Sequence, residues 1–472
     1  MQALTGDFLT DEGRLNHILG KGRNFDLIAR RFLLGGRRAS IWCIDGYADD
    51  GVLERMGQFW LEITPQQLQQ AQTLQSFMER FVSFGESNVE RRMEEIVTAV
   101  LLGKTALMVE GFCGCVLMDA KSYPVRGVEE PSDGRVLRGA HDGFVEVLVQ
   151  NTALLRRRIR DPRLTLEGHR IGKSSGTDVV LAYMQGQADE ELLNQLRQKL
   201  EGLDIRSFSM GQESVAEALL PGQWYNPFPR VRYTERPDKA TASLLEGKIL
   251  LLVDNSPVVM LLPTRLPDFL QDTNDYYFPP LVGGYQRLIR LVMLVLTVLI
   301  TPVWYLLVTD PEIHRGALRF LAVQGEVHVP LLLQLFLVEF VVDILKLASL
   351  NTPNVLSNSF SMLGALILGD FAVQARWLVP EVLVYMAFVA IANFVQPSFE
   401  LGYALKLWRM ALLLLCAGLR WWGFWLGIAG GAALLLATKP LLGKHYLYPI
   451  VPFDGRELKR LLLRRSIDRD NT

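Results

Sequence analysis

The sequence has no excess of charge of either sign. Its 472 residues include 49 Lys and Arg against 50 Asp and Glu, which gives a formal net charge of −1. Proteins that bind nucleic acid usually carry a basic excess, so this balance argues against nucleic acid as a partner. The first 20 residues also lack a basic stretch followed by an apolar run. We therefore expect no signal peptide, and we expect the N-terminal half to stay in the cytoplasm.

Cysteine and histidine are scarce, with four Cys and six His in the chain. Cys113 and Cys115 share one face of an expected strand, but no second Cys or His cluster accompanies them. We interpret them as small apolar residues in a reducing compartment. No Ser/His/Asp or HExxH pattern is present, and no acidic pair stands out in the first 285 residues. The sequence predicts no metal, no cofactor and no enzyme activity.

One stretch, HRIGKSS at 169–175, looks at first like a phosphate-binding loop. The phosphate-loop pattern needs glycine five residues before Gly172, and that position holds Glu167. The neighbouring Gly168 is one residue too close, and a shorter loop cannot wrap phosphates in the same way. We predict no nucleotide site there.

Long apolar runs are present, but only in the second half of the chain. Half of all residues are hydrophobic. Strand and helix patterns alternate through 1–135 and again through 136–285, where a linker helix comes first. Residues 286–450 contain the apolar runs, and 451–472 form a basic amphipathic tail suited to an interface. We predict two cytoplasmic α/β subdomains followed by a polytopic α-helical membrane domain.

The membrane half contains six apolar segments, and a helix that crosses a bilayer needs about 20 such residues. The segments are 291–308, 331–350, 355–373, 378–395, 405–419 and 421–436. We expect four to six of them to cross. Only Arg420 separates the last two, which predicts a sharp turn or a segment that enters the membrane and returns. Both flanks are basic, so the positive-inside rule places both ends in the cytoplasm.

The segment LLLQLFLVEFVVDILKLASL at 331–350 carries charges in an apolar context. Glu339, Asp343 and Lys346 fall on one helical face, whereas Gln334 lies well off it. A charge in hydrocarbon is costly unless it is paired or hydrated. Two hypotheses remain open. Glu339 and Asp343 line a cation pore in a ring of subunits, with Lys346 one turn further and Gln334 near one end only if the helix bends there; or the charged residues form an ion pair that joins helices.

A basic run, LLRRRIRDPR, lies at 154–163. Its arginines spread around a helix and form a collar, not a single pocket. Arg156, Arg157, Arg158 and Arg160 are candidates for contact with anionic lipid headgroups or with an acidic neighbouring subunit. The alternative is a solvated surface with salt bridges between subunits.

Several stretches resemble the A-subunit family of spore germination receptors, the GerA family. They are DGFVEVLVQNTALLRRRIRDPRL (142–164), NPFPRVRYTERPD (226–238), GALILGDFAVQA (364–375) and FVQPSFELGYALKLWRM (394–410). Together they cover nearly the whole chain, in the family's order. The family's acids match Glu339 and Asp343, and its arginine matches Lys346. The receptor A subunits usually have glutamate where this chain has Gln334.

The resemblance implies a location and a role. The location is the inner membrane of a bacterial endospore, among membrane lipids. The role is in germination, as one copy in a homo-oligomeric ring whose membrane helices conduct cations out of the spore core. It also implies that the soluble domain gates the channel and that a transporter-like B subunit or other germination receptors are partners. The alternative is a non-conducting scaffold that organises those receptors.

Overall fold

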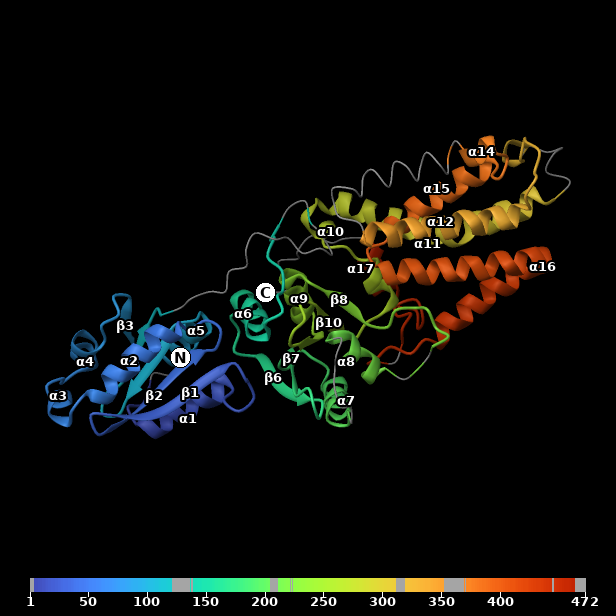
Figure 1. Cartoon of the computed structure of the whole chain (residues 1–472). Helices are drawn as coiled ribbons and strands as arrows, with labels where there is room; N and C mark the ends of the chain where they lie inside the picture. Colours follow the sequence, from blue (N-terminus) through green and yellow to red (C-terminus); the bar gives the residue numbers. More distant parts are fainter. Residues whose placement is uncertain are drawn as a thin grey trace. The chain divides into compact units, whose positions relative to one another are not determined.

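The computed structural model describes residues 4–120, 136, 139–203, 211–220, 222, 224–310, 319–351, 369, 371–443 and 445–462. It divides into two compact units (Figure 1). The first unit comprises Met1–Gly222, Val231–Thr264 and Leu441–Gly443. The second comprises Gln223–Arg230, Arg265–Pro440 and Lys444–Thr472. The first unit contains both α/β subdomains, and the second contains the long apolar helices.

The first subdomain is an antiparallel sheet with helices on both faces. Its elements are α1 (Phe8–Leu19), β1 (Leu27–Leu34), β2 (Arg37–Ile44), α2 (Asp50–Glu62), α3 (Pro65–Gln69), α4 (Leu74–Phe81), β3 (Ser87–Glu90), α5 (Met93–Leu101), β4 (Thr105–Val109) and β5 (Cys115–Met118). Among the described residues the strand order is β1-β2-β4-β5-β3. Hydrophobic residues of α1 and α5 cover one face, and those of α2, α3 and α4 cover the other.

The sequence pattern of 64–85 predicts one helix, but the structure has two short ones. Each begins at a threonine cap, Thr64 for α3 and Thr73 for α4, and each cap forms a reciprocal capping box. A threonine that caps a helix N-terminus has an extended backbone. It therefore begins a new helix and cannot lie inside a continuous one. The apolar periodicity therefore located the helical region but not its interruption.

The second subdomain has the same architecture. Its elements are α6 (Leu148–Arg158), β6 (Leu164–Ile171), β7 (Thr177–Met184), α7 (Glu190–Glu201), α8 (Gln212–Leu219), β8 (Arg232–Thr234), α9 (Pro237–Leu245), β9 (Ile249–Val253) and β10 (Val259–Leu262). The described strands are ordered β6-β7-β9-β10-β8 and pair antiparallel. Helices α7 and α8 cover one face, and α6 and α9 cover the other.

The two subdomains are structural repeats of each other. Both sheets follow the order first, second, fourth, fifth, third, and one helix precedes each first strand. In both, a Gly-x-Ala-Asp sequence follows the second strand, and the aspartate, Asp49 or Asp189, caps the next helix. The preceding glycines, Gly46 and Gly186, both have positive φ, at 75° and 79°. These shared turns reveal a duplication that the predicted α/β pattern did not.

Helix α6 of the second subdomain packs against the first subdomain. Arg156 is 1% exposed, and its Nε donates to Asp26 Oδ2 at 2.7 Å. Its Nη2 donates to Asp26 Oδ1 at 3.0 Å, and its Nη1 donates to the Leu164 carbonyl at 3.1 Å. Nearby, the Tyr47 hydroxyl donates to the Ala153 carbonyl at 2.6 Å. The predicted linker helix therefore contacts both subdomains and joins them.

This arrangement corrects one prediction about the basic collar. Arg156 does not contact a headgroup or a neighbouring subunit, because it is buried against Asp26 within its own chain. Arg158 also pairs within the chain, at 2.6 Å from Asp142. Arg157 and Arg160 are exposed, and their external contacts remain a prediction.

The second unit is mainly helical. Its elements are η1 (Leu266–Leu270), α10 (Asn274–Tyr277), α11 (Pro280–Val308), η3 (Arg319–Leu321), α12 (Leu331–Asn351), α14 (Ala372–Gln374), α15 (Pro380–Phe394), α16 (Phe399–Ala437) and α17 (Gly455–Leu462). Among the described residues, α11 and α16 are long and apolar enough to cross a membrane, and α15 is a shorter apolar helix. Most of the predicted segment 355–373 lies outside the described residues.

Helix α16 reverses direction at one residue, as the spacing predicted. Arg420 has φ 51° and ψ −132°, which breaks the helix into two halves (Figure 1, red). The halves pack closely, and Trp408 Nε1 donates to the Gly427 carbonyl at 3.1 Å. A Cβ added to Gly423 would collide with the Leu415 backbone. The hairpin therefore depends on glycine where its two halves meet.

Candidate functional site

The charged face of α12 meets two cationic side chains of α16. Lys406 Nζ lies 3.0 Å from Glu339 Oε1 and also contacts Asp343 Oδ2. Arg409 Nη2 lies 2.7 Å from Glu339 Oε2, and its Nη1 donates to the Thr297 carbonyl of α11 at 3.0 Å. We call Glu339, Asp343, Lys406 and Arg409 the buried charge network. It connects α11, α12 and α16.

Most of this network is shielded from solvent. Glu339, Lys406 and Arg409 are 7%, 4% and 2% exposed, whereas the Asp343 side chain is 30% exposed. Two carboxylates face two cations, so the formal charges cancel. Mutual pairing offsets the large cost of removing these groups from water, and loss of one partner would leave an uncompensated charge. The Oδ1 atom of Asp343 is buried and accepts no hydrogen bond within the described chain.

Gln334 does not belong to this network. Its side chain is fully buried, accepts from the Val379 amide at 2.8 Å and donates to the Val329 carbonyl at 2.7 Å. These bonds satisfy backbone groups next to the first turns of α12 and α15. These bonds give Gln334 a role at the starts of two helices, and its place at a pore stays a prediction.

Lys346 lies one turn beyond Asp343 on the same helix and also contacts two aromatic rings. Its Nζ sits 4.8 Å from the ring centre of Phe394 on α15 and 5.5 Å from that of Tyr403 on α16. The faces of aromatic rings attract cations, most strongly where water is excluded. Lys346 therefore connects α12 to two neighbouring helices. The carboxylates of α12 are paired with Lys406.

Sequence reasoning missed Lys406 and Arg409. They lie three residues apart on one face of an apolar helix, within the stretch FVQPSFELGYALKLWRM. A cation in an apolar helix needs a partner just as the carboxylates of Glu339 and Asp343 do. Residues three or four apart share one helical face, so the two acids of α12 can pair with the two cations of α16.

A second buried ion cluster lies at the start of α11. Arg290 Nη1 is 2.7 Å from Asp275 Oδ2, and Arg287 Nε is 3.3 Å from the same oxygen. All three side chains are less than a tenth exposed. Arg287 and Arg290 precede the apolar run 291–308, and they are the basic flank on which the predicted orientation of this span depends. Asp275 offsets part of that charge, so the flank is less basic than the sequence alone implies.

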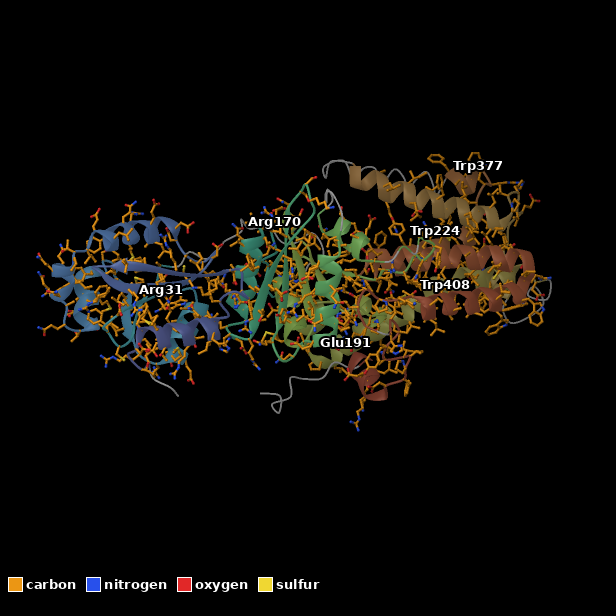
Figure 2. All side chains as sticks on the ribbon, turned by 90° about the horizontal axis from the view of Figure 1, so that it is seen from below. Arg31, Arg170, Glu191, Trp224, Trp377 and Trp408 are labelled. Carbon is orange, nitrogen blue, oxygen red and sulfur yellow. The ribbon has the colours of Figure 1, made fainter. Side chains whose placement is uncertain are left out.

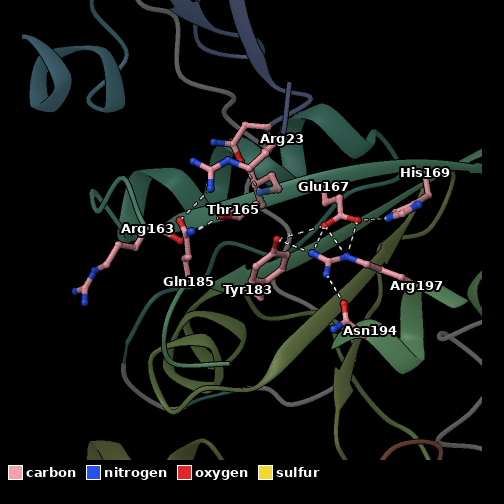
Figure 3. Close-up of polar contacts among 11 residues, drawn as sticks. Arg23, Arg163, Thr165, Glu167, His169, Tyr183, Gln185, Asn194 and Arg197 are labelled. Atoms are coloured by element: carbon pink, nitrogen blue, oxygen red, sulfur yellow. Dashed lines mark hydrogen bonds and ion pairs between the residues drawn. The ribbon is translucent and has the colours of Figure 1, made fainter. Parts of the chain in front are cut away.

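A polar cluster also lies in the second α/β subdomain (Figure 3). Glu167 on β6 accepts from Arg197 Nη2 of α7 at 2.7 Å and lies 2.8 Å from His169 Nε2. The Tyr183 hydroxyl is 3.3 Å from Glu167. Burial alone would raise the pKa of Glu167, but the bonds from His169 and Arg197 outweigh it and lower the pKa to about 2. Glu167, noted in the sequence as the residue that breaks a phosphate-loop pattern, joins the sheet to α7.

The buried charge network, the cluster around Asp275 and the cluster around Glu167 all lack the composition of a metal site. Among the described residues, no group of three or more His, Cys, Asp or Glu side chains could hold a metal ion. Each carboxylate described above is instead matched with arginine, lysine or histidine. These arrangements are therefore suited to holding elements together or to responding to charge.

Comparison with known proteins identifies the family. The pattern that defines the Bacillus/Clostridium GerA spore germination protein family matches residues 14–472. The chain belongs to the GerA family. This confirms the resemblance inferred from the four sequence motifs.

Individual relatives agree with this assignment. Stage V sporulation protein AF of Bacillus subtilis (strain 168) is 32% identical over 95% of this chain and 90% of that protein. The stretches of this chain that most resemble this GerA relative are NPFPRVRYTERPD (226–238), LKLASLNTP (345–353) and VPEVLVY (379–385). The uncharacterized membrane protein YfkQ of the same organism is 27% identical, over 93% of this chain and 85% of that protein.

One solved structure is also similar. It is the N-terminal domain of the A subunit of the Bacillus megaterium spore germinant receptor GerK3. It covers 56% of this GerA chain and 96% of its own, with 24% identity and a TM-score of 0.43.

Proposed function

We propose that this GerA protein is a polytopic component of the endospore inner membrane that conducts cations during germination, as one copy in a ring. The observation that carries the proposal is the buried charge network. Ionisable side chains inside apolar helices are costly, and in membrane proteins they commonly mark ion pathways. The soluble subdomains and the tail would face the spore core, and a transporter-like B subunit is a proposed partner.

In this proposal, the pairing within the network belongs to a closed state of the pathway. Lys406 and Arg409 occupy the positions next to Glu339 and Asp343 that a permeating cation would need. A cation cannot replace them while both remain in place, because like charges repel at short range. Opening would require the first half of α16 to move away from α12. Asp343, the most exposed member, would then meet solvent first.

A flux experiment tests this proposal. Purified protein in anionic liposomes would be compared with Lys406→Met, with Asp343→Asn and with Lys459→Met, an exposed lysine of α17, as a control. We expect Lys406→Met to raise cation flux, because it leaves two carboxylates with one partner. Asp343→Asn should lower the preference for cations, and Lys459→Met should change flux least. Absence of flux from all four proteins, with the membrane partner included, would contradict the proposal.

A non-conducting scaffold is the second candidate. It is favoured by the pairing of both acids within one chain, which fits a network that only holds helices together. In that case Lys406→Met would lower thermal stability and yield without producing current. The flux and stability readouts therefore separate the two functions.

A further inference from the structure

The core of the second α/β subdomain includes two leucines from far along the chain. Leu441 and Leu442 are 4% and 1% exposed, and they belong to the hydrophobic cluster on the face that α7 and α8 cover. Their neighbours in that cluster include Leu196, Leu200, Val215 and Leu219. The two leucines thus complete a core that the preceding subdomain sequence leaves open, and their burial stabilises it.

A hydrogen bond and apolar burial hold this pair in place. Lys199, in the last turn of α7, donates from Nζ to the Leu441 carbonyl at 3.0 Å. Gly443 follows the pair with φ +89°, a backbone conformation that favours glycine. The Lys199 bond and the burial of both leucines therefore hold the segment against the second subdomain.

A very short connection links this segment to the α16 hairpin. Helix α16 ends at Ala437, and only Thr438, Lys439 and Pro440 precede Leu441. Such a connection spans about 14 Å at full extension, and its proline restricts the backbone further. A displacement of the docked leucines that exceeds the slack in these residues must therefore pull on the end of α16.

We propose that Leu441 and Leu442 form a coupling segment through which the second α/β subdomain controls the position of the α16 hairpin. The first half of that hairpin carries Lys406 and Arg409. The mechanical part of the inference stands on the docked leucines alone. Its consequence for ions rests on the proposed function, because only there does movement of α16 release Glu339 and Asp343.

Hydrogen exchange on the full chain in lipid nanodiscs tests the mechanical part. Leu442→Asp places a charge in the core and should undock the segment. We expect exchange at least about tenfold faster both in α7 and α8 and in the last turns of α16. Ile450→Asp is the matched control, since Ile450 lies eight residues further on and is 51% exposed. It should leave both regions unchanged.

A second variant covers the case in which Leu442→Asp unfolds the whole subdomain. Insertion of Gly-Ser-Gly-Ser between Lys439 and Pro440 lengthens the connection and leaves both the leucines and the hairpin intact. We expect unchanged exchange in α7 and α8 but faster exchange at the end of α16, because the helix end loses its restraint. Exchange at the end of α16 that matches wild type in this insertion variant would overturn the coupling. No ion flux enters either readout, so failure of the channel proposal would be seen separately.

Discussion

Arg156 and Asp26 are joined by two hydrogen bonds, at 2.7 and 3.0 Å, between side chains that are 1% and 0% exposed. The pair connects helix α6 of one repeat to the start of β1 in the other. Removal of one partner leaves a buried charge without compensation, which is among the more costly single changes a protein can undergo.

The first prediction concerns this pair. Arg156→Met should lower the free energy of unfolding of the first unit by about 3–5 kcal/mol. Asp26→Leu combined with Arg156→Met should recover most of the loss, because no charge then remains buried. Arg158→Met is the control two residues away, and its partly exposed pair with Asp142 should contribute less than about 1 kcal/mol. Chemical denaturation of the full chain measures all three, and an equal loss for both arginines would contradict the prediction.

The second prediction concerns the α16 hairpin. A Cβ at Gly431 would collide with the Trp408 ring, whereas a Cβ at Gly430 meets nothing within 4 Å. Gly431→Ala should therefore destabilise the protein by about 1–3 kcal/mol or force the halves apart. Gly430→Ala should be neutral or slightly stabilising. Thermal unfolding in detergent distinguishes them, and identical midpoints would show that the two halves do not pack closely.

The third prediction is a pH dependence. The folded-state pKa of Glu167 is about 2, below its ordinary value of 4.5, so its contribution to stability is present above about pH 4.5 and lost as the pH falls toward 2. After allowance for its partial exposure we expect about 1–2 kcal/mol. Glu167→Gln should remove this part of the acid sensitivity, while Glu201→Gln at the exposed end of α7 should not. Unfolding curves between about pH 6 and pH 3 measure the difference.

The fourth prediction places the membrane boundary. Arg420 donates to the carbonyl of Thr309, the residue that caps the end of α11, so the hairpin turn lies at one end of the helices. Trp422 beside it is 82% exposed, and Trp377 protrudes similarly at 64% (Figure 2). Tryptophan favours the membrane–water interface. Lipids brominated near the headgroup should quench Trp422 more than lipids brominated at the chain end.

A matched pair of variants isolates that signal. Trp422→Phe should remove a measurable part of the lipid-dependent quenching. Trp304→Phe should remove little, because Trp304 is 2% exposed and its Nε1 donates to the Leu321 carbonyl. Equal effects of the two substitutions would argue against an interfacial hairpin turn.

The sequence predicted what depends on local pattern. Short apolar runs bounded by turn residues predict β7 and the β9–β10 hairpin, and the single Arg420 between two apolar runs predicts the reversal in α16. The local sequence pattern does not predict which faces of α12 and α16 meet, because that depends on the packing of helices distant in the chain. The acids were therefore recognised without Lys406 and Arg409. The docking of Leu441 could not be predicted either, because two apolar residues after a helix show no periodicity.

The repeat has one further consequence. Gly46 and Gly186 occupy equivalent corners, yet a Cβ on Gly46 would strike Val149 of α6, whereas a Cβ on Gly186 would meet open space within the described structure. The two corners therefore share a backbone turn but differ in their surroundings, because only the first packs against a helix of the other subdomain. A side chain is excluded at Gly46 both by the positive φ and by this packing, whereas at Gly186 the positive φ is the constraint.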